Sequence, residues 1–320
     1  MNVMTAVKTR GPEPVIDKKK FKHKSRGLIP KGLTLTASVL IIGILAIILG
    51  NVFLGGYETI SWKFLSSPPE NGMEEGGIFP AIFGTVVLVV LMTIAVIPVG
   101  VFTAIYLHEY TRPDAFLPRM IRLAVSNLAG VPSIVFGLFG LGFFIGFIGT
   151  NVDKFFFASD GPVWGQPAII WAALTLAVLT LPVVIVATEE ALRVIPRELR
   201  EASYALGATR LQTIWRIIIP QAMPGILTGA ILAVSRGAGE VAPIMFTGAA
   251  YYLPYLPKAL NDQFMEMGYH IYVMATQSPD IEKTKPILYG TVLVLLVLTF
   301  ALNFIAILIR SRLRSRRTGL

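Results

Sequence analysis

The sequence predicts an all-α membrane protein, a polytopic bundle of six transmembrane helices, and three observations predict it. Hydrophobic residues make up 54% of the 320 residues and charged residues only 15%, with a mean hydropathy of +0.68. An average soluble domain carries about 25% charged residues. Six apolar runs each reach the roughly 20 residues that cross the hydrocarbon of a bilayer. The Lys and Arg residues concentrate in alternate segments between these runs.

The six apolar runs occupy most of the chain between two basic tails. They fall at 33–54, 78–106, 121–148, 168–188, 217–246 and 286–309. Some carry an internal proline, such as Pro98 and Pro182. A membrane helix tolerates proline where neighbouring helices satisfy the freed backbone groups, which suits helices that line a cavity. We therefore predict a transmembrane domain over 33–309, between basic cytoplasmic tails at 1–32 and 310–320.

The distribution of Lys and Arg predicts which side of the membrane each connecting segment faces. If both termini lie inside, the inside segments hold 22 of the 28 Lys and Arg residues and the outside segments hold five, with Arg236 in the membrane. Because positively charged loops stay in the cytoplasm, we predict a multi-pass protein of the plasma (inner) membrane with both termini cytoplasmic. The tail at 1–32 is expected to be disordered and to lie against anionic lipid headgroups. A nucleic-acid-binding arm is the disfavoured alternative.

The sequence lacks the motifs of most enzyme and metal sites. It contains no cysteine, no GxxxxGK[ST] phosphate loop, no HExxH and no EF-hand loop. The three histidines, His23, His108 and His270, lie far apart, and each is expected to be solvated or interfacial. We therefore predict a transporter subunit that is not an enzyme and binds no metal or cofactor itself, with ATP hydrolysis on a separate chain.

The fifth apolar run carries two charged residues, Arg236 and Glu240. A charge at mid-membrane costs roughly 2.5–3.5 kcal/mol on insertion scales, so such residues usually face a partner, a cavity or a substrate path. On one helix, both would share an arc of about 80° with Gly225, Gly229 and Ala233, and at i,i+4 spacing they could pair. The residues alone leave two functions open: a structural ion pair between helices, or a site for a charged solute.

The segment between the fourth and fifth runs, 189–217, is too long for a turn and too polar to insert. Leu199, Ala202 and Leu206 recur with helical spacing, and Gly207 stands where a helix C-terminal cap belongs. A helix resting on the lipid headgroups would fit this pattern. Because the apolar side is short and made mostly of Ala and Leu, we expect instead a cytoplasmic coupling loop whose helix presses into a socket on another protein.

This loop resembles the EAA signature of ABC importer permeases. The signature reads EAA, three residues, G, nine residues, I-x-L-P, and the stretch from Glu201 to Pro220 keeps its spacing with Ser203 and Ile219 as the two departures. The resemblance implies the type I ABC importer permease fold and a coupling helix that docks in a groove of an ATPase subunit. It places the docking contact on Glu201, Ala202, Ser203 and Gly207.

Other stretches resemble phosphate ABC permeases in particular. They are GGIFPAIFGT (76–85), PVGVFTAIYLHEY (98–110), NLAGVPSIVFGLFGLG (127–142) and SRGAGEVAPIMF (235–246). The resemblance implies a PstA-type subunit, with the PstC type as second choice, in which Arg236 and Glu240 take part in phosphate passage. Ser133 is then either a further phosphate contact or a helix-packing hydroxyl. The implied partners are an ATPase dimer that binds ATP and Mg, a second, PstC-like permease, and an extracytoplasmic phosphate-binding protein.

We therefore predict the permease subunit of an ATP-driven importer of inorganic phosphate that forms half of the translocation pathway. A guanidinium group suits this cargo, since its planar donors match the oxygens of phosphate. Three alternatives remain at this point: a permease for another oxyanion (sulfate, molybdate or phosphonate), a non-transporting membrane scaffold or sensor, and a secondary, ion-coupled transporter.

Overall fold

The computed structural model describes residues 28–112, 115–157 and 161–315 of the chain. The chain divides into two units, 1–51 and 52–320, which are described separately. In the first unit the described residues form the greater part of one apolar helix, α2 (Leu28–Gly56), whose side chains are mostly exposed. The predicted basic tail at 1–32 lies almost entirely outside the described residues.

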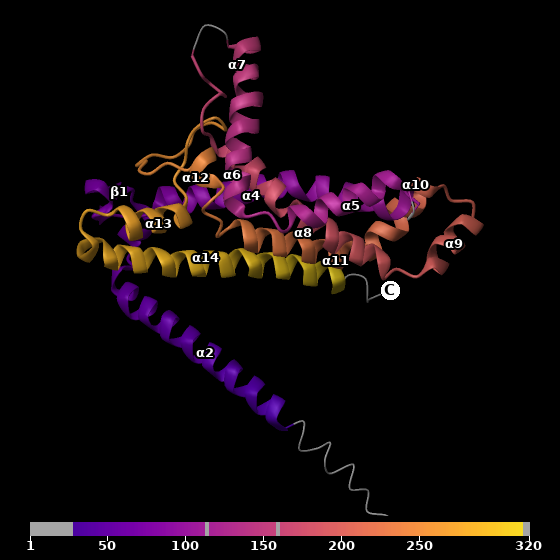
Figure 1. The fold of residues 1–320 in the computed structure, drawn as a ribbon, viewed down its shortest axis with the longest axis horizontal. Coiled ribbons are helices and arrows are strands. Elements are labelled where there is room, and N and C mark those ends of the chain that lie inside the picture. The colour runs from indigo at the N-terminus through magenta and orange to yellow at the C-terminus, as the bar shows by residue number, and fades with distance from the viewer. Residues whose placement is uncertain (1–27, 113–114, 158–160, 316–320) are drawn as a thin grey trace, which may run out of the picture. The chain divides into compact units, whose positions relative to one another are not determined.

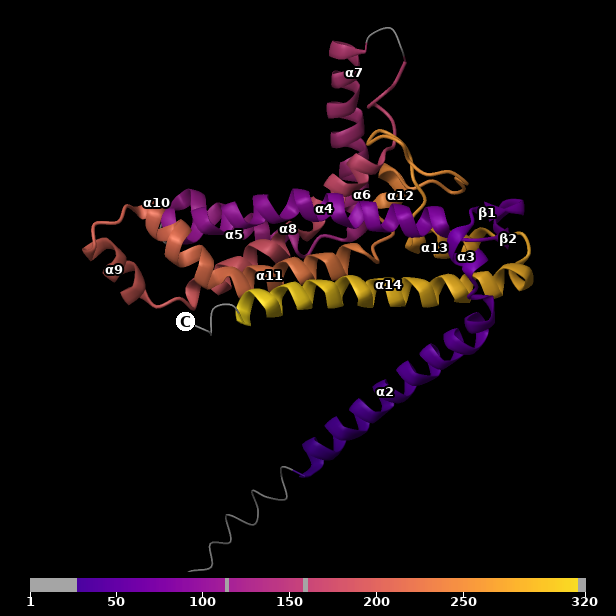
Figure 2. The ribbon, with the colours of Figure 1, turned by 180° about the vertical axis from the view of Figure 1, so that it is seen from behind.

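The second unit is mainly helical in its described part (Figures 1 and 2). The long helices are α4 (Phe79–Ile105), α8 (Ile169–Arg193), α11 (Ile219–Gly237) and α14 (Ile281–Ser315). The shorter α-helices are α3 (Trp62–Ser66), α5 (Phe116–Leu128), α6 (Ser133–Phe139), α7 (Thr150–Phe156), α9 (Arg197–Ala205), α10 (Arg210–Thr213), α12 (Ile244–Thr247) and α13 (Met267–Gln277). Three segments are π-helical: η3 (Tyr106–Tyr110), η4 (Gly140–Gly149) and η5 (Ile214–Ile218).

The remaining elements lie between α2 and α4. Two 3₁₀ turns, η1 (Tyr57–Thr59) and η2 (Asn71–Met73), flank α3 and a small hairpin. The hairpin pairs β1 (Pro69–Glu70) with β2 (Glu75–Gly76) in antiparallel register. These short elements close the end of the bundle next to α13 and the start of α14 (Figure 2).

α8 is the central helix of the second unit. Of the 18 consecutive residues that form its most apolar stretch, 67% are buried, whereas none of the corresponding stretch of α14 is buried. α4 and α11 both approach α8 through glycine: Gly100 faces Val184, and a Cβ atom on Gly229 would lie 2.8 Å from the Cβ atom of Ala187. Small residues allow close packing of membrane helices. The small-residue face predicted in the fifth span is therefore used to pack against α8.

In the part of the chain that the structure describes, six helical segments are long and apolar enough to cross a membrane, which is the predicted number. They are Pro30–Thr59, Phe79–Tyr110, Ser133–Phe156, Ile169–Arg193, Arg210–Gly237 and Ile281–Arg312. The helices continue through Pro98 of α4 and Pro182 of α8, although Pro98 and Gly100 were expected to interrupt the second span.

Two predicted boundaries are wrong. The third run, expected at 121–148, is broken between α5 and α6, because Pro132 has extended backbone angles and begins a new helix. The fifth, expected to reach residue 246, ends at Gly237 and continues as a turn before α12. α14 runs to Ser315, so it includes the first residues of the basic tail at 310–320, whose cytoplasmic placement stays a prediction. Hydropathy marks apolar composition, so it does not separate two apolar helices from one.

The segment from α6 through η4 to α7 runs across the direction of α8 and α14 (Figures 1 and 2). Its return towards α8 is fixed by the carboxylate of Asp153, which accepts backbone N–H groups from Val163, Trp164 and Gly165 at 3.1, 2.8 and 2.6 Å. A carboxylate with three such donors is well satisfied although it is almost fully buried.

The long segment after α12 contains the helix α13, anchored on α4. The carboxylate of Glu266 caps α13 by accepting from the N–H groups of Gly268 and Tyr269 at 2.9 and 2.7 Å. Thr85 of α4 donates its hydroxyl to Glu266 at 3.4 Å and accepts from the backbone N–H of Met267 at 3.0 Å. This cap joins α13 directly to the second span.

His270 corrects an expectation from the sequence. It was expected to be solvated or interfacial, but it is 2% exposed within α13 and its Nδ1 atom has no hydrogen-bond partner among the described residues. The flanking Met267 and Val273 are also buried in α13. The tertiary packing of this loop, which hydropathy does not reveal, accounts for the difference.

Glu266 and His270 predict opposite pH dependences of stability. Burial raises the pKa of Glu266 from 4.5 to about 7 and lowers the pKa of His270 from 6.5 to about 4. The stabilisation that Glu266 contributes to the free energy of unfolding is therefore present below pH 4.5 and lost as the pH rises through 7. The stabilisation that His270 contributes is present above pH 6.5 and lost as the pH falls through 4.

Thermal unfolding in detergent checks these signs. For Glu266→Gln we expect a midpoint temperature that rises between pH 4 and 6.5, because only the histidine then titrates. For His270→Gln we expect a midpoint that falls between pH 4.5 and 7. The wild-type profile should be flatter than either between pH 4.5 and 6.5. Two variants that both retain the wild-type profile would contradict the prediction.

Candidate functional site

The predicted pair Arg236–Glu240 forms at the end of α11. Nε of Arg236 donates to Oε1 of Glu240 at 3.3 Å, and the two side chains are 39% and 20% exposed. Because the helix ends at Gly237, Glu240 reaches its partner from the following turn rather than from the helix face that the sequence suggested. The glycines at 237 and 239 favour this end, since glycine is a poor helix former.

The pair leaves most of the guanidinium free. A guanidinium carries five N–H donors, and Glu240 is the single hydrogen-bond or ion-pair partner of the Arg236 side chain among the described residues. Four donors on a partly exposed side chain are thus available to a ligand. A salt bridge whose role is only to hold helices together would engage both edges of the guanidinium and would join residues of two different helices.

The neighbouring residue Ser235 holds this end of α11 against α14. Its hydroxyl donates to Oδ1 of Asn303 at 2.5 Å. A short hydrogen bond one residue before Arg236 restricts how the end of α11 can rotate. Asn303 was not singled out in the sequence; the signal that could have found it is a lone amide inside the apolar sixth run.

Ser133 begins α6, directly after the break at Pro132. Its hydroxyl forms no hydrogen bond with another described residue, and none joins it to Arg236. One turn further on, a Cβ atom on Gly137 would lie 3.0 Å from the carbonyl oxygen of Ala242 and the Cα atom of Pro243. The structure therefore brings the start of α6 beside the segment that follows Glu240, and leaves the role of Ser133 a prediction.

The predicted coupling helix is α9, and it ends as its sequence indicates. Gly207 has a φ of +81°, its N–H donates to Tyr204 O at 2.9 Å, and the N–H of Ala208 donates to Ser203 O at 3.2 Å. These two bonds form a Schellman cap, in which glycine accommodates the left-handed angle. Thr209 and Gln212 then form a capping box that starts α10.

The four residues predicted to contact an ATPase differ in exposure. Glu201, Ala202 and Gly207 are exposed. Ser203 is 5% exposed and its hydroxyl lies 2.8 Å from that of Thr213 in α10. Ser203 therefore ties α9 to α10 from inside and does not present its side chain to a partner, while the other three remain candidates for the contact.

Replacing Gly207 by valine should uncouple the loop without unfolding the spans. A β-branched residue at a left-handed φ introduces backbone strain on the order of 1–3 kcal/mol. A Cβ atom at position 207 would meet no neighbouring residue within 4 Å, so the expected effect comes from this strain and not from a clash with a neighbour. We expect loss of ATPase binding with normal membrane insertion, measured by co-purification and by the amount of chain in the membrane. Gly72 at φ +67° also faces open space, so Gly72→Val is the matched control, expected to retain the ATPase.

A buried ion pair fixes α9 to the membrane helices. The guanidinium of Arg200 bonds the carboxylate of Glu109 with Nη2 at 2.7 Å and Nε at 3.2 Å, and the side chains are 14% and 6% exposed. Arg200 also donates to the carbonyl oxygens of Leu192 and Ile195, at 3.2 and 2.9 Å. One side chain thus joins the coupling helix to η3, which continues α4, and to the end of α8.

Arg210 adds a second connection from α10. It donates to the carbonyl oxygen of Glu109, and its guanidinium carbon lies 5.1 Å from the centre of the Tyr110 ring. The sequence does not predict the Glu109–Arg200 pair, because 91 residues separate the partners. The available signal was a carboxylate at the end of the second apolar run, where burial demands a partner.

The described residues contain no group of three or more His, Cys, Asp or Glu side chains that could hold a metal ion.

Comparison with known proteins points to one family. Residues 96–318 match the family described as "Binding-protein-dependent transport system inner membrane component". The "Probable ABC transporter permease protein YqgI" of Bacillus subtilis is 33% identical over 227 residues, covering 71% of this chain and 72% of that protein. The "Probable phosphate transport system permease protein PstA" of Methanocaldococcus jannaschii is 34% identical over 230 residues, covering 72% and 74%.

A solved structure supports the fold. In the crystal structure of a bacterial ABC transporter involved in the import of the acidic polysaccharide alginate, one chain superposes with a TM-score of 0.64 at 15% identity. The alignment covers 92% of this chain and 99% of that one. At this identity the likeness concerns the fold, and it confirms the type I importer permease fold that the EAA-like loop predicts.

Proposed function

As a member of the binding-protein-dependent transport system inner membrane components, this chain is the non-catalytic, multi-pass permease of an ABC importer, and we propose that its cargo is inorganic phosphate. Permeases of this family work with ATPase subunits and periplasmic binding proteins. The PstA-type relative supports phosphate as the cargo.

The observation that carries the proposal is the free edge of the Arg236 guanidinium. It lies at the end of a membrane-spanning helix, with one 3.3 Å bond to Glu240 and four unused donors. Arg matches tetrahedral oxyanions through two parallel N–H···O bonds, which are stronger than neutral ones. In our proposal, Glu240 neutralises Arg236 while the path is empty and releases it when phosphate arrives.

The proposed complex contains four kinds of subunit. A PstC-like permease supplies the other half of the path, an extracytoplasmic phosphate-binding protein delivers the substrate, and two ATPase subunits bind ATP and Mg beneath α9. We expect both termini in the cytoplasm, from the distribution of Lys and Arg. Closure of the ATPase dimer would move α9, and the Glu109–Arg200 pair would pass that motion to α4 and α8.

Uptake of labelled phosphate by cells lacking the chromosomal copy of this chain tests the cargo. We expect uptake to depend on the chain and an excess of unlabelled phosphate to abolish it, whereas sulfate, molybdate and phosphonate should leave it unchanged. Stronger competition by one of those anions would identify that anion as the cargo in place of phosphate. Co-purification of an ATPase and a second permease is expected, and their absence would favour a scaffold or sensor.

A further inference from the structure

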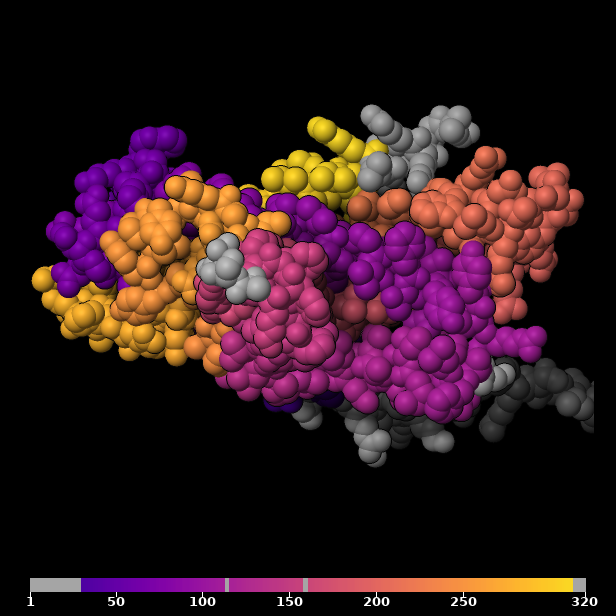
Figure 3. All heavy atoms as spheres, turned by 90° about the horizontal axis from the view of Figure 1, so that it is seen from above, coloured from indigo at the N-terminus to yellow at the C-terminus, as the bar shows by residue number. Residues whose placement is uncertain are grey.

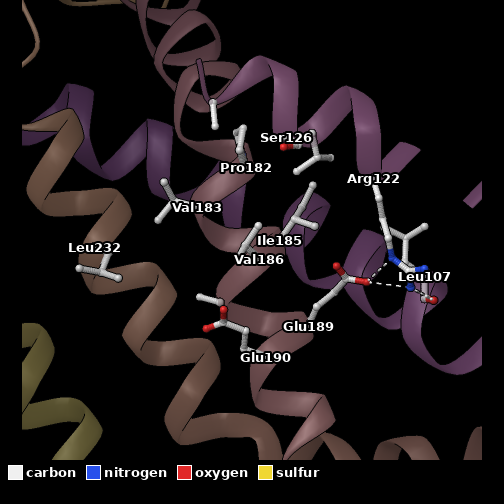
Figure 4. A pocket seen from close by; sticks show the side chains of 13 residues that line it. Leu107, Arg122, Ser126, Pro182, Val183, Ile185, Val186, Glu189, Glu190 and Leu232 are labelled. Atoms are coloured by element: carbon white, nitrogen blue, oxygen red, sulfur yellow. Dashed lines mark hydrogen bonds and ion pairs between the residues drawn. The ribbon is translucent and has the colours of Figure 1, made fainter. Parts of the chain in front are cut away.

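A cavity of about 540 Å³ lies between α5, α8 and α11. Figure 4 shows Val186 of α8 and Leu232 of α11 on its apolar side, and Arg122 of α5 with Glu189 of α8 together at one end. In Figure 3 the atoms of α8 are set back between α5 and the segment from α6 to α7, so the surface is hollowed there. The cavity therefore combines an apolar wall with one ion pair.

The Arg122 guanidinium is held by two acceptors and open on its other edge. Its Nε and Nη2 lie 3.2 and 3.1 Å from the same oxygen of Glu189, and Nη2 donates to Leu107 O at 2.9 Å. Nη1 has no partner among the described residues. The side chain of Arg122 is 37% exposed and that of Glu189 only 12%, so a ligand reaches the arginine more easily than its counter-ion.

The same residues open into a second, basic cavity. Leu107 and Arg122 line both the first cavity and a neighbouring one of about 770 Å³ at the end of the bundle that carries α9. Two carboxylates, Glu109 and Glu201, line the second cavity with five guanidinium groups: Arg122, Arg193, Arg197, Arg200 and Arg210. The surplus of positive charge makes it attractive to anions.

Two of these arginines are free to bind a ligand. Arg193 and Arg197 are exposed, and neither forms an ion pair or hydrogen bond within the described ranges. Arg200 and Arg210 are occupied by Glu109, through its carboxylate and its carbonyl oxygen respectively. The basic cavity therefore has a fixed part, which holds α9, and an unpaired part.

The first cavity adjoins the face of α11 that carries Arg236. Leu232 lines the cavity and lies four residues, one helical turn, before Arg236, so both side chains project from the same helix face. Arg236, the first cavity, Arg122 and the basic cavity thus follow one another towards the α9 end.

We propose that the two cavities form the exit half of the anion path. Arg122 is the second guanidinium along this path that binds the oxyanion, which takes the place of Glu189. This inference rests on the proposed function. It explains why Arg122 lies at the junction of the cavities with one edge open. A bond that merely fastened α5 to α8 would not need a cavity on each side.

Thiol labelling tests the proposal, because the chain contains no cysteine. Ser126 lines the first cavity and is exposed, so Ser126→Cys in the assembled importer, in inside-out vesicles, reports on it. We expect an anionic thiosulfonate to react about tenfold faster than a cationic one of equal size, and millimolar inorganic phosphate to slow both. Arg122→Gln should abolish the preference and the protection. Arg119→Gln, on the same helix but lining neither cavity, should change neither.

A position outside the path completes the labelling test. Ser311 of α14 is exposed and lines neither cavity, so Ser311→Cys should react independently of phosphate. Equal reaction of the two reagents at position 126, or labelling that phosphate leaves unchanged, would overturn the proposal in favour of a crevice that faces lipid.

Uptake by a double variant separates a phosphate station from a structural ion pair. Arg122→Gln with Glu189→Gln removes both charges, so no unpaired charge remains to disturb the fold. We expect a normal amount of complex but at least tenfold slower phosphate uptake. Normal uptake would show that the pair only fastens helices, and would overturn the inference while leaving phosphate as the cargo. If uptake does not depend on Arg236 or on the chain at all, the proposed function itself fails.

Discussion

Replacing Arg236 by glutamine is expected to reduce phosphate uptake by about 100-fold. Hydrogen bonds from a charged group contribute about 1.5–3 kcal/mol each, and roughly 2.7 kcal/mol corresponds to a factor of 100. Because the side chain is partly exposed and, within the described ranges, bonded to Glu240 alone, its loss should leave folding intact. Uptake of labelled phosphate at a substrate concentration below saturation measures the effect.

Three further variants sharpen the Arg236 experiment. Arg236→Lys keeps the charge but loses the planar fork, so partial activity is expected. Arg216→Gln removes an exposed arginine near the opposite end of the same span and should leave uptake unchanged. Glu240→Gln should bind phosphate more tightly but release it more slowly. Full uptake in Arg236→Gln, with complex present at the normal level, would refute the role of this guanidinium.

Glu109→Gln is expected to detach the coupling helix and abolish ATP-driven uptake. Removing one partner of a buried ion pair costs about 3–5 kcal/mol, since the other charge stays buried without compensation. Arg200 would be left 14% exposed with carbonyl acceptors alone. The expected measurements are loss of ATPase co-purification, or ATP hydrolysis that no longer responds to phosphate and its binding protein.

The control for Glu109 separates a coupling defect from a general loss of charge. The side chain of Glu282 is 86% exposed, and its carboxylate forms one long ion pair with Lys285, at 3.9 Å. Glu282→Gln should therefore leave coupling and stability unchanged. A Glu109→Gln variant that retains phosphate-stimulated ATP hydrolysis and normal uptake would show that α9 needs no connection to the end of α4.

The fifth span has one feature that its residues indicate and one that they do not. The i,i+4 spacing indicated that Arg236 and Glu240 could pair, and they do. The residues did not show that the helix stops at Gly237, because two glycines, Gly237 and Gly239, are compatible with continued helix and with a turn. The break before Ser133 was missed for the same reason, although Pro132 marks it.

The coupling loop shows the opposite case. Its helix, its cap at Gly207 and its exposed face follow from local rules of helix spacing and capping, so the sequence predicted them correctly. The inward direction of Ser203 was not predictable, because its partner Thr213 belongs to the next helix.

By itself, then, the sequence determined the number of spans, the capped helix of the loop and the presence of charges in the membrane, since hydropathy, glycine and charge act locally or through the bilayer. The tertiary structure alone decided which distant charges meet, Glu109 with Arg200 and Arg122 with Glu189. It also decided which side chains are sealed from water, as with Glu266 and His270. Both outcomes depend on how helices far apart in the chain pack together, and packing is a property of pairs of segments that no single segment encodes.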